Sequence, residues 1–112
     1  MSTPSSTWTD ICAAGDILPG TGVAALVSDR HVAVFRLDAD QFFAIDNVDP
    51  KSGASVLSRG LLGNLGDRIV VASPLYKNHF DLRTGECLEA PEHSVRAHTV
   101  SVEDGRVRLA LA

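Results

Sequence analysis

The chain has no run of apolar residues long enough to cross a lipid bilayer. Its apolar stretches, such as Val23–Val27 and Ile69–Ala72, are far shorter than the roughly 20 residues that a membrane-spanning helix needs. It also has no stripe of lysine and arginine, because the 10 basic residues are dispersed and the formal net charge is −4. Nucleic-acid binding needs concentrated positive charge, so the composition argues against that class of function.

Cysteine is scarce as well. Cys12 and Cys87 lie far apart in the sequence, and in a reducing compartment such single residues are more often free thiols or small core residues than a disulfide. Met1–Ser6 is polar and has neither the basic start nor the apolar stretch of a signal peptide. We therefore expect residues 1–6 to form a disordered lead-in and the protein to be cytoplasmic.

Helical periodicity is also missing, since no stretch of about 10–15 residues shows it. With 112 residues, 45% of them hydrophobic and 21% charged, the chain has the size and composition of one globular domain. Short apolar or alternating runs between turn signals predict strands at Trp8–Ala13, Val23–Val27, His31–Leu37, Gln41–Asp46, Arg68–Ala72, Asn78–Asp81, Val95–Glu103 and Arg106–Leu111. The predicted fold class is therefore all-β, an antiparallel sandwich or small barrel.

Three segments predict details of this fold. His31–Leu37 is largely apolar on both faces, which indicates a strand between two packed layers. In Val95–Glu103 the apolar residues change phase near Thr99, which predicts a β-bulge there. The dipeptide Asp104-Gly105 predicts a type I′ hairpin turn before the last strand.

The middle of the chain interrupts the alternating pattern. Asp46–Gly66 contains several glycines and a proline, with leucines scattered between them, and is predicted to be loop-rich and not a continuous strand. We therefore predict a single domain over residues 7–112, with a small loop-bearing subdomain inserted at about residues 47–85.

Two loops of this insert resemble the cluster-binding loops of a Rieske iron–sulfur domain. The second, Ser73–Gly85, is similar to the pattern C-P-x-H-G-x-x-F-D-L-x-T-G and keeps its frame residues Pro74, Phe80, Asp81, Leu82, Thr84 and Gly85. The first, Ala44–Ala54, is similar to A-x-x-N-x-C-P-H-x-G-A and keeps Asn47, Pro50, Gly53 and Ala54. The resemblance extends from about Trp8 to Leu111 and implies a Rieske-like antiparallel fold.

All four metal-ligand positions of the Rieske pattern are replaced. Asp49 and Ser73 occupy the two cysteine positions, and Lys51 and Tyr76 occupy the two histidine positions. A Rieske centre needs two thiolates and two imidazoles, and carboxylate, hydroxyl, ammonium and phenol groups do not replace them. We therefore predict no metal site and no cofactor in this chain.

Among ligand-free domains of this kind, the chain resembles the small subunit of the assimilatory NAD(P)H-dependent nitrite reductase. The resembling segments are Ser73–Lys77, His79–Gly85, Trp8–Cys12 and Asp16–Gly20. The resemblance implies a non-catalytic subunit that supports a large subunit in the reduction of nitrite to ammonia during nitrate assimilation. In that family the large subunit carries FAD, an iron–sulfur cluster and sirohaem, and neither nucleic acid nor a membrane is expected as a partner.

Other functions are compatible with the same residues. One is a stand-alone protein-interaction module, and another is a Rieske-type ferredoxin-like component of an oxygenase that has lost its cluster. A catalytic set of Asp49, Lys51 and Tyr76 would need burial to shift their pKa values. We favour a solvated ion pair between Asp49 and Lys51, with Tyr76 covering the base of the loop.

The tips of the two loops are the predicted surface for a partner. Loops on a rigid scaffold are frequent binding sites, and a loop frame without its ligands needs another role. We predict docking through Lys51, Lys77, Asn78 and His79. Stabilisation of the large subunit and gating of access between its redox domains are both compatible with such a surface.

Overall fold

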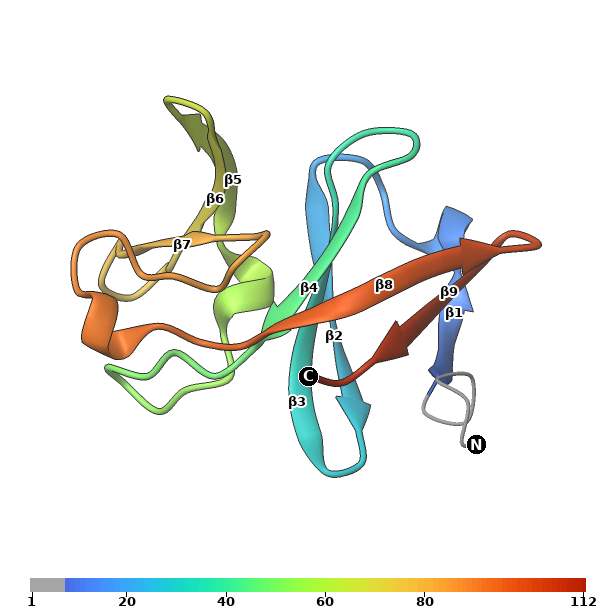
Figure 1. Cartoon of the computed structure of the whole chain (residues 1–112), viewed down its shortest axis with the longest axis horizontal. Coiled ribbons are helices and arrows are strands. Elements are labelled where there is room, and N and C mark those ends of the chain that lie inside the picture. Colours follow the sequence, from blue (N-terminus) through green and yellow to red (C-terminus); the bar gives the residue numbers. More distant parts are fainter. Residues whose placement is uncertain (1–7) are drawn as a thin grey trace.

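The computed structural model describes residues 8–112, so the lead-in predicted at residues 1–6 lies outside the described residues. The described elements (Figure 1) are nine strands and three short 3₁₀ helices: β1 (Trp8–Ala13), η2 (Ala14–Asp16), β2 (Thr21–Val27), β3 (Arg30–Arg36), β4 (Phe42–Asp46), η3 (Leu57–Arg59), β5 (Leu61–Leu65), β6 (Arg68–Ala72), β7 (His79–Asp81), η4 (Pro91–His93), β8 (Ala97–Glu103) and β9 (Arg106–Ala110). None of the helices in this part of the chain is long and apolar enough to cross a membrane.

The strands form two sheets in which every pairing is antiparallel. The larger sheet has six strands in the order β1-β9-β8-β4-β3-β2, and the smaller has three in the order β5-β6-β7. Figure 1 shows the larger sheet curled on one side of the molecule and the smaller sheet beside it. The all-β, antiparallel fold class is thus confirmed. The smaller sheet falls within the predicted insert of about residues 47–85, whose standing as a subdomain stays a prediction.

The hydrophobic core has two halves, one on each face of β3 and β4. Along these strands the buried side chains alternate between the halves: Ala33, Phe35 and Ile45 belong to the first core, and Val32, Val34 and Ala44 belong to the second. Because successive residues of a strand point to opposite faces, a strand that is apolar on both faces can complete two cores at once. The predicted position of residues 31–37 between two packed layers is confirmed.

The β-bulge predicted near Thr99 is wrong. β8 pairs with β9 in continuous register from Thr99 onward, while its first residues pair with β4. Ala97 packs against the first core and Val100 against the second. The apolar face therefore changes because the strand passes from one core to the other. A register shift does occur in β1, between Asp10 and Cys12, where that strand pairs with β9.

The segment Asp46–Gly66, predicted to be loop-rich, also contains the strand β5, which the sequence pattern did not indicate. This strand pairs with β6 on one side and forms an edge of the smaller sheet. Leu62 packs against the first core, whereas the other residues of β5 are exposed. An edge strand with one partly buried side chain shows no apolar alternation, which explains why the pattern is absent from the sequence.

Positive backbone angles define the hairpin turns. Asp104 and Gly105, between β8 and β9, have φ values of 53° and 75°, as a type I′ turn requires. Ser28 and Asp29, between β2 and β3, have φ values of 49° and 66°. The first of these turns confirms the prediction from the sequence.

Both cysteines are free thiols, as predicted. Cys87 is completely buried in the first core, and Cys12 packs against the second. Burial raises the pKa of the Cys12 thiol above its ordinary value, and the nearby Asp16 carboxylate adds to the shift. A raised pKa disfavours the reactive thiolate form, so Cys12 is a packing group, and Cys87 is one because it is completely buried among apolar residues.

Candidate functional site

The four degenerate ligand positions lie on two loops, which we define as the first loop (residues 47–56) and the second loop (residues 73–78). Both lie on the side of the molecule away from β1 (Figure 1). Asn47, which is 1% exposed, fixes the first loop: its Oδ1 accepts the Ser58 N–H at 2.6 Å, and its Nδ2 donates to Ser55 Oγ at 2.8 Å. The second loop is closed by Ser73, whose N–H donates to the Asn78 carbonyl at 2.8 Å.

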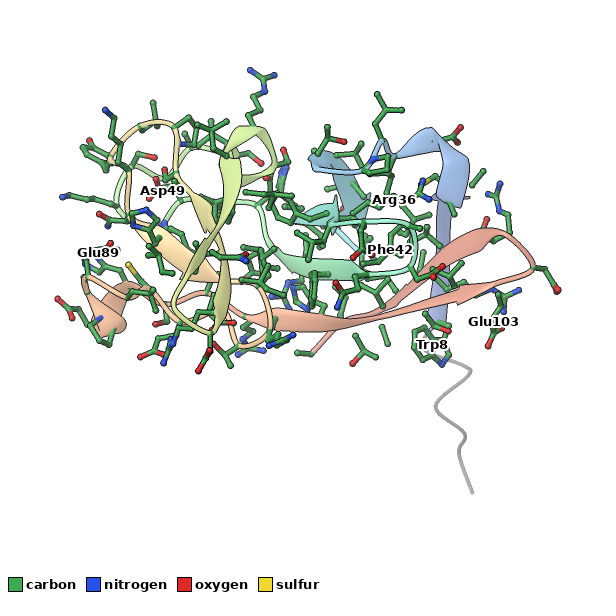
Figure 2. The ribbon with its side chains drawn as sticks, turned by 90° about the horizontal axis from the view of Figure 1, so that it is seen from above. Trp8, Arg36, Phe42, Asp49, Glu89 and Glu103 are labelled. Atoms are coloured by element: carbon green, nitrogen blue, oxygen red, sulfur yellow. The ribbon has the colours of Figure 1, made fainter. Side chains whose placement is uncertain are left out.

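The two residues at the predicted cysteine positions, Asp49 and Ser73, contact each other at the base of the loops. Ser73 Oγ donates a hydrogen bond of 2.5 Å to Asp49 Oδ2, and both residues are only 1% exposed. The other carboxylate oxygen, Oδ1, accepts the Lys51 N–H at 2.9 Å. Figure 2 shows Asp49 among the loops of the smaller sheet. A hydrogen bond to a charged group contributes about 1.5–3 kcal/mol, so this contact joins the loops without a metal.

The two residues at the predicted histidine positions, Lys51 and Tyr76, also contact each other. Lys51 Nζ lies 4.7 Å from the centroid of the Tyr76 ring, a cation–π geometry. Tyr76 is 49% exposed, and an exposed contact of this kind contributes about 0.5–1 kcal/mol. We call the two contacts together, Asp49–Ser73 and Lys51–Tyr76, the loop clasp.

The solvated ion pair predicted between Asp49 and Lys51 is wrong. The Asp49 carboxylate is buried against Ser73, while the Lys51 ammonium lies over the Tyr76 ring. Because the acid and the base each have a different partner, the three side chains of the suggested catalytic set are not connected. The geometry gives no support to catalysis by that set.

The predicted docking residues differ in exposure. Lys51 and Lys77 are exposed at the loop tips, whereas Asn78 and His79 are half-buried. His79 is turned toward Glu89: its Nδ1 lies 2.6 Å from Glu89 Oε2, and its N–H donates to Glu89 Oε1 at 2.8 Å. Of the predicted set, the two lysines are exposed and form no ion pair among the described residues, and Lys51 lies over the Tyr76 ring.

Glu89 is a site residue that the sequence motifs do not indicate. It follows β7 in the chain, outside both loops, and only the fold brings it to His79. Burial acts to raise the pKa of Glu89, but the hydrogen bonds from His79 outweigh it and hold that pKa below its ordinary value. The carboxylate therefore remains charged and fixes the orientation of the His79 ring.

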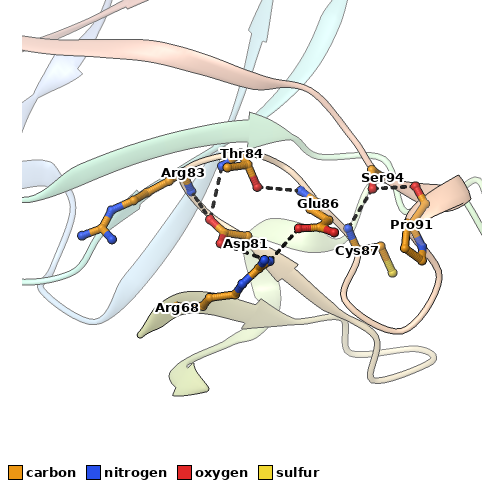
Figure 3. Close-up of polar contacts among 8 residues, drawn as sticks. All are labelled: Arg68, Asp81, Arg83, Thr84, Glu86, Cys87, Pro91 and Ser94. Atoms are coloured by element: carbon orange, nitrogen blue, oxygen red, sulfur yellow. Dashed lines mark hydrogen bonds and ion pairs between the residues drawn. The ribbon is translucent and has the colours of Figure 1, made fainter. Parts of the chain in front are cut away.

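A tight turn with its own hydrogen bonds follows β7 (Figure 3). Asp81 Oδ1 accepts the N–H groups of Arg83 and Thr84 at 2.7 and 3.2 Å, and the Gly85 N–H donates to the Asp81 carbonyl at 2.7 Å. The Nη1 atom of Arg68 lies 3.6 Å from Asp81 Oδ2. The Arg83 side chain points away from this network in Figure 3. The frame residues of the motif thus have structural roles here.

The side chains at the four positions do not fit a [2Fe–2S] cluster. They offer a carboxylate, an ammonium, a hydroxyl and a phenol, whereas a Rieske centre needs two thiolates and two imidazoles. Cys12 and Cys87 belong to the two cores, and over residues 8–112 no three His, Cys, Asp or Glu side chains are placed to hold a metal. That this chain binds no cofactor stays a prediction. The chemistry of the side chains at the four positions supports it.

Known proteins resemble this chain over nearly its whole length. A family model described as Rieske-like [2Fe-2S] domain matches residues 7–110. The nitrite reductase (NADH) small subunit of Escherichia coli (strain K12) is 50% identical over 105 residues, which are 93% of this chain and 97% of that protein. The NMR structure of the E. coli protein NirD matches with a TM-score of 0.85 at 50% identity, covering 91% of this chain and 94% of that one.

The chain is also similar to an oxygenase ferredoxin and to part of a nitrite reductase large subunit. The ferredoxin of carbazole 1,9a-dioxygenase from Nocardioides aromaticivorans has a TM-score of 0.80 at 28% identity, covering 95% of this chain and 99% of that one. The nitrite reductase [NAD(P)H] large subunit of Klebsiella oxytoca is 45% identical over 104 residues, which are 93% of this chain and 11% of that protein. In that organism a domain of this kind is part of the large-subunit polypeptide.

Proposed function

This chain belongs to the Rieske-like [2Fe-2S] domain family, and from that membership we propose that it is the small subunit of an NAD(P)H nitrite reductase. The observation that carries the proposal is the 50% identity to the E. coli small subunit over nearly the whole of both chains. The complex is an oxidoreductase that reduces nitrite to ammonia, and this chain supports the reaction without a catalytic residue of its own. The relatives favour this function over an oxygenase ferredoxin, whose sequence is only 28% identical.

The partner is the nitrite reductase large subunit. The Klebsiella protein supports this pairing, because it joins a domain like this one to a large subunit in one polypeptide. The redox chemistry then belongs to the large subunit, which in the resembled family carries FAD, an iron–sulfur cluster and sirohaem. The complex acts in the cytoplasm, and neither nucleic acid nor a membrane takes part.

Docking occurs through the loop tips, with Lys51, Lys77, Asn78 and His79. The loop clasp supports this assignment, because it holds both loops in one arrangement before a partner arrives. A surface that is ordered beforehand loses less conformational entropy on binding. The bound small subunit in turn stabilises the large subunit. A partner that binds the folded state and not the unfolded state shifts the folding equilibrium toward the folded state.

The proposal is tested by producing a tagged large subunit with and without this chain. We expect the two to co-purify, and we expect the large subunit alone to lose nitrite-reducing activity faster on warming. Lys51→Glu should weaken co-purification, while Arg83→Glu, the same charge change at an exposed turn, should not. A large subunit that keeps full activity and stability alone, with no co-purification of this chain, would show the proposal to be wrong.

A further inference from the structure

A groove beside the loop tips is lined on one side by Ser73, Lys77 and His79, which are described above, and on the other by residues outside the loops. It has a volume of about 430 Å³ and lies between the start of β5 and the second loop. Gly60, Leu61, Ala72 and Pro74 give it an apolar lining. The cross-strand pairing of Leu61 with Ala72 places these two sides next to each other.

Large apolar side chains are exposed around this groove. Leu61 is 80% exposed, and Leu75 and Tyr76, which directly follow Pro74 in the second loop, are 52% and 49% exposed. Single exposed apolar residues are ordinary, but a contiguous group of them marks an interaction site. Because β5 is an edge strand, its outer side is open to a neighbouring chain.

The charges at the groove have one sign. Arg59 and Lys77 line it, no carboxylate does, and neither cation has an ion-pair partner among residues 8–112. Elsewhere in the described chain Arg30, Arg68, Arg106 and Arg108 pair with carboxylates, whereas Arg36, Arg83 and Arg96 do not. Lys51 and Lys77 are also the two lysines of the whole sequence, and both lie at the loop tips. A chain with a net charge of −4 thus has a basic, partly apolar end.

We propose that this groove binds an acidic segment of the nitrite reductase large subunit. An apolar side chain of that segment packs against Leu61, and its carboxylates pair with Arg59 and Lys77. The inference rests on the proposed function and adds the chemistry of the partner and, at Arg59 and Leu61, a second anchor outside the loop tips. Charge complementarity selects this end, because the acidic remainder of the chain repels an acidic partner.

Binding of the purified large subunit to this chain, measured by titration calorimetry at low and high salt, tests the groove. We expect the wild-type affinity to fall as salt rises, because exposed charge pairs are screened. Arg59→Glu should weaken binding roughly tenfold at low salt and remove much of its salt dependence. Leu61→Ser should weaken binding at both salt concentrations, since its contribution is apolar.

Each variant has a matched control. Arg83→Glu makes the same charge change at a residue that does not line the groove, and Leu26→Ser removes a leucine that is 65% exposed on β2. Thermal unfolding establishes that each variant is folded. If Arg59→Glu does not fold, Lys77→Asn replaces it, since asparagine tolerates the φ of 60° at that position.

The outcomes separate the groove from the proposed function. Wild-type binding with equal affinities for groove variants and controls would overturn the groove while leaving the small-subunit function intact. No binding of the wild type would overturn both. A second copy of this chain is the other occupant to be tested, by sedimentation of the chain alone. One result would assign the groove to a second copy and overturn the proposal: the chain self-associates, and Leu61→Ser abolishes this self-association while leaving binding to the large subunit unchanged.

Discussion

At the residue scale, the buried carboxylate of Asp49 decides how the two loops are held. Both of its oxygens accept hydrogen bonds, from Ser73 Oγ and from the Lys51 N–H. A buried polar group is costly only when it lacks a partner. The polar side chains of Asp49 and Ser73 are therefore buried without a large cost in free energy.

Ser73→Ala removes the donor to Asp49 Oδ2 and leaves a buried carboxylate oxygen unpaired. We expect the free energy of unfolding in urea to fall by about 1–3 kcal/mol. Ser101→Ala is the control, because Ser101 is half-buried in β8 and has no side-chain hydrogen bond within the described residues. Its effect should stay within about 0.5 kcal/mol. Equal losses in the two variants would contradict a stabilising role of the clasp.

Glu89 predicts a pH-dependent contribution to stability. Its pKa in the folded chain lies below the ordinary value of 4.5, because the His79 hydrogen bonds outweigh the effect of burial. A lowered folded-state pKa stabilises the fold above the unfolded pKa, and this stabilisation is lost as pH falls through the folded pKa. Wild type should therefore be more stable than Glu89→Gln at neutral pH, with the difference disappearing in acid.

The measurement is urea unfolding of both proteins at several pH values across this range. Because Glu89 is partly exposed, the difference should be small. Glu92→Gln, at an exposed position of η4, is the control and should show no comparable change. A difference between wild type and Glu89→Gln that persists unchanged in acid would count against the pairing with His79.

At the element scale, the connection between β7 and β8 depends on one glycine. Gly85 has a φ of 82°, and its carbonyl accepts the Val95 N–H at 2.9 Å. A Cβ at this position would run into the Val95 carbonyl. The turn after β7 and the return of the chain toward β8 therefore require glycine for two separate reasons.

Gly85→Ala should lower the free energy of unfolding by at least about 2 kcal/mol, because it adds backbone strain and a steric clash. Gly63→Ala is the matched control, since no atom lies near its added Cβ and its φ is ordinary. Within a strand, alanine in place of glycine is expected to be neutral or to stabilise by up to about 1 kcal/mol. Chemical denaturation measures both, and a tolerated Gly85→Ala would contradict the described turn.

The elements that the sequence predicted well are those whose pattern reflects their burial. β3 was placed between two layers because both of its faces are apolar, and the two cores confirm it. β8 shows the limit of the same rule: its phase change near Thr99 reflects a passage between cores and not a bulge. β5 was missed because an exposed edge strand has no core to impose alternation on its residues.

At the scale of the whole molecule, the chain keeps the Rieske frame while side-chain contacts take the place of cluster ligands. The ferredoxin of carbazole 1,9a-dioxygenase has the same fold at a TM-score of 0.80. The loop clasp joins the same two loops that a Rieske cluster would join, through a hydrogen bond and a cation–π contact. The loops are therefore ordered by the polypeptide itself.

Restoring the ligands should restore the cluster. The variant with Asp49→Cys, Lys51→His, Ser73→Cys and Tyr76→His places two thiolates and two imidazoles on the two loops. We expect it to bind about two irons per chain and to show the visible spectrum of a Rieske centre after reconstitution. The variant with the two cysteines alone is the control and should not give that spectrum. A folded fourfold variant without iron would show that the loop frame has diverged along with its ligands.

Some residues of the candidate site lie within the two sequence motifs, and others lie outside them. The predicted ligand positions and the exposed lysines are local properties of two loops, so a sequence motif is enough to propose them. Glu89, Arg59 and Leu61 lie outside those loops, and only hydrogen bonding to His79 and the pairing of β5 with β6 bring them to the site. The spacing of residues along the sequence does not indicate such contacts.

A linear pattern is enough to indicate the all-β class, the paired loops, the absence of Rieske ligands from the matched positions and the hairpin at Asp104-Gly105, because each depends on residues that are adjacent or fixed in spacing. The tertiary structure alone decided that Asp49 is buried against Ser73 and that Lys51 lies over Tyr76, replacing the expected ion pair. It also decided that a basic, apolar groove lies beside the loops. These contacts join residues from different strands and loops, and their partners are chosen by packing and register, which a linear pattern does not contain.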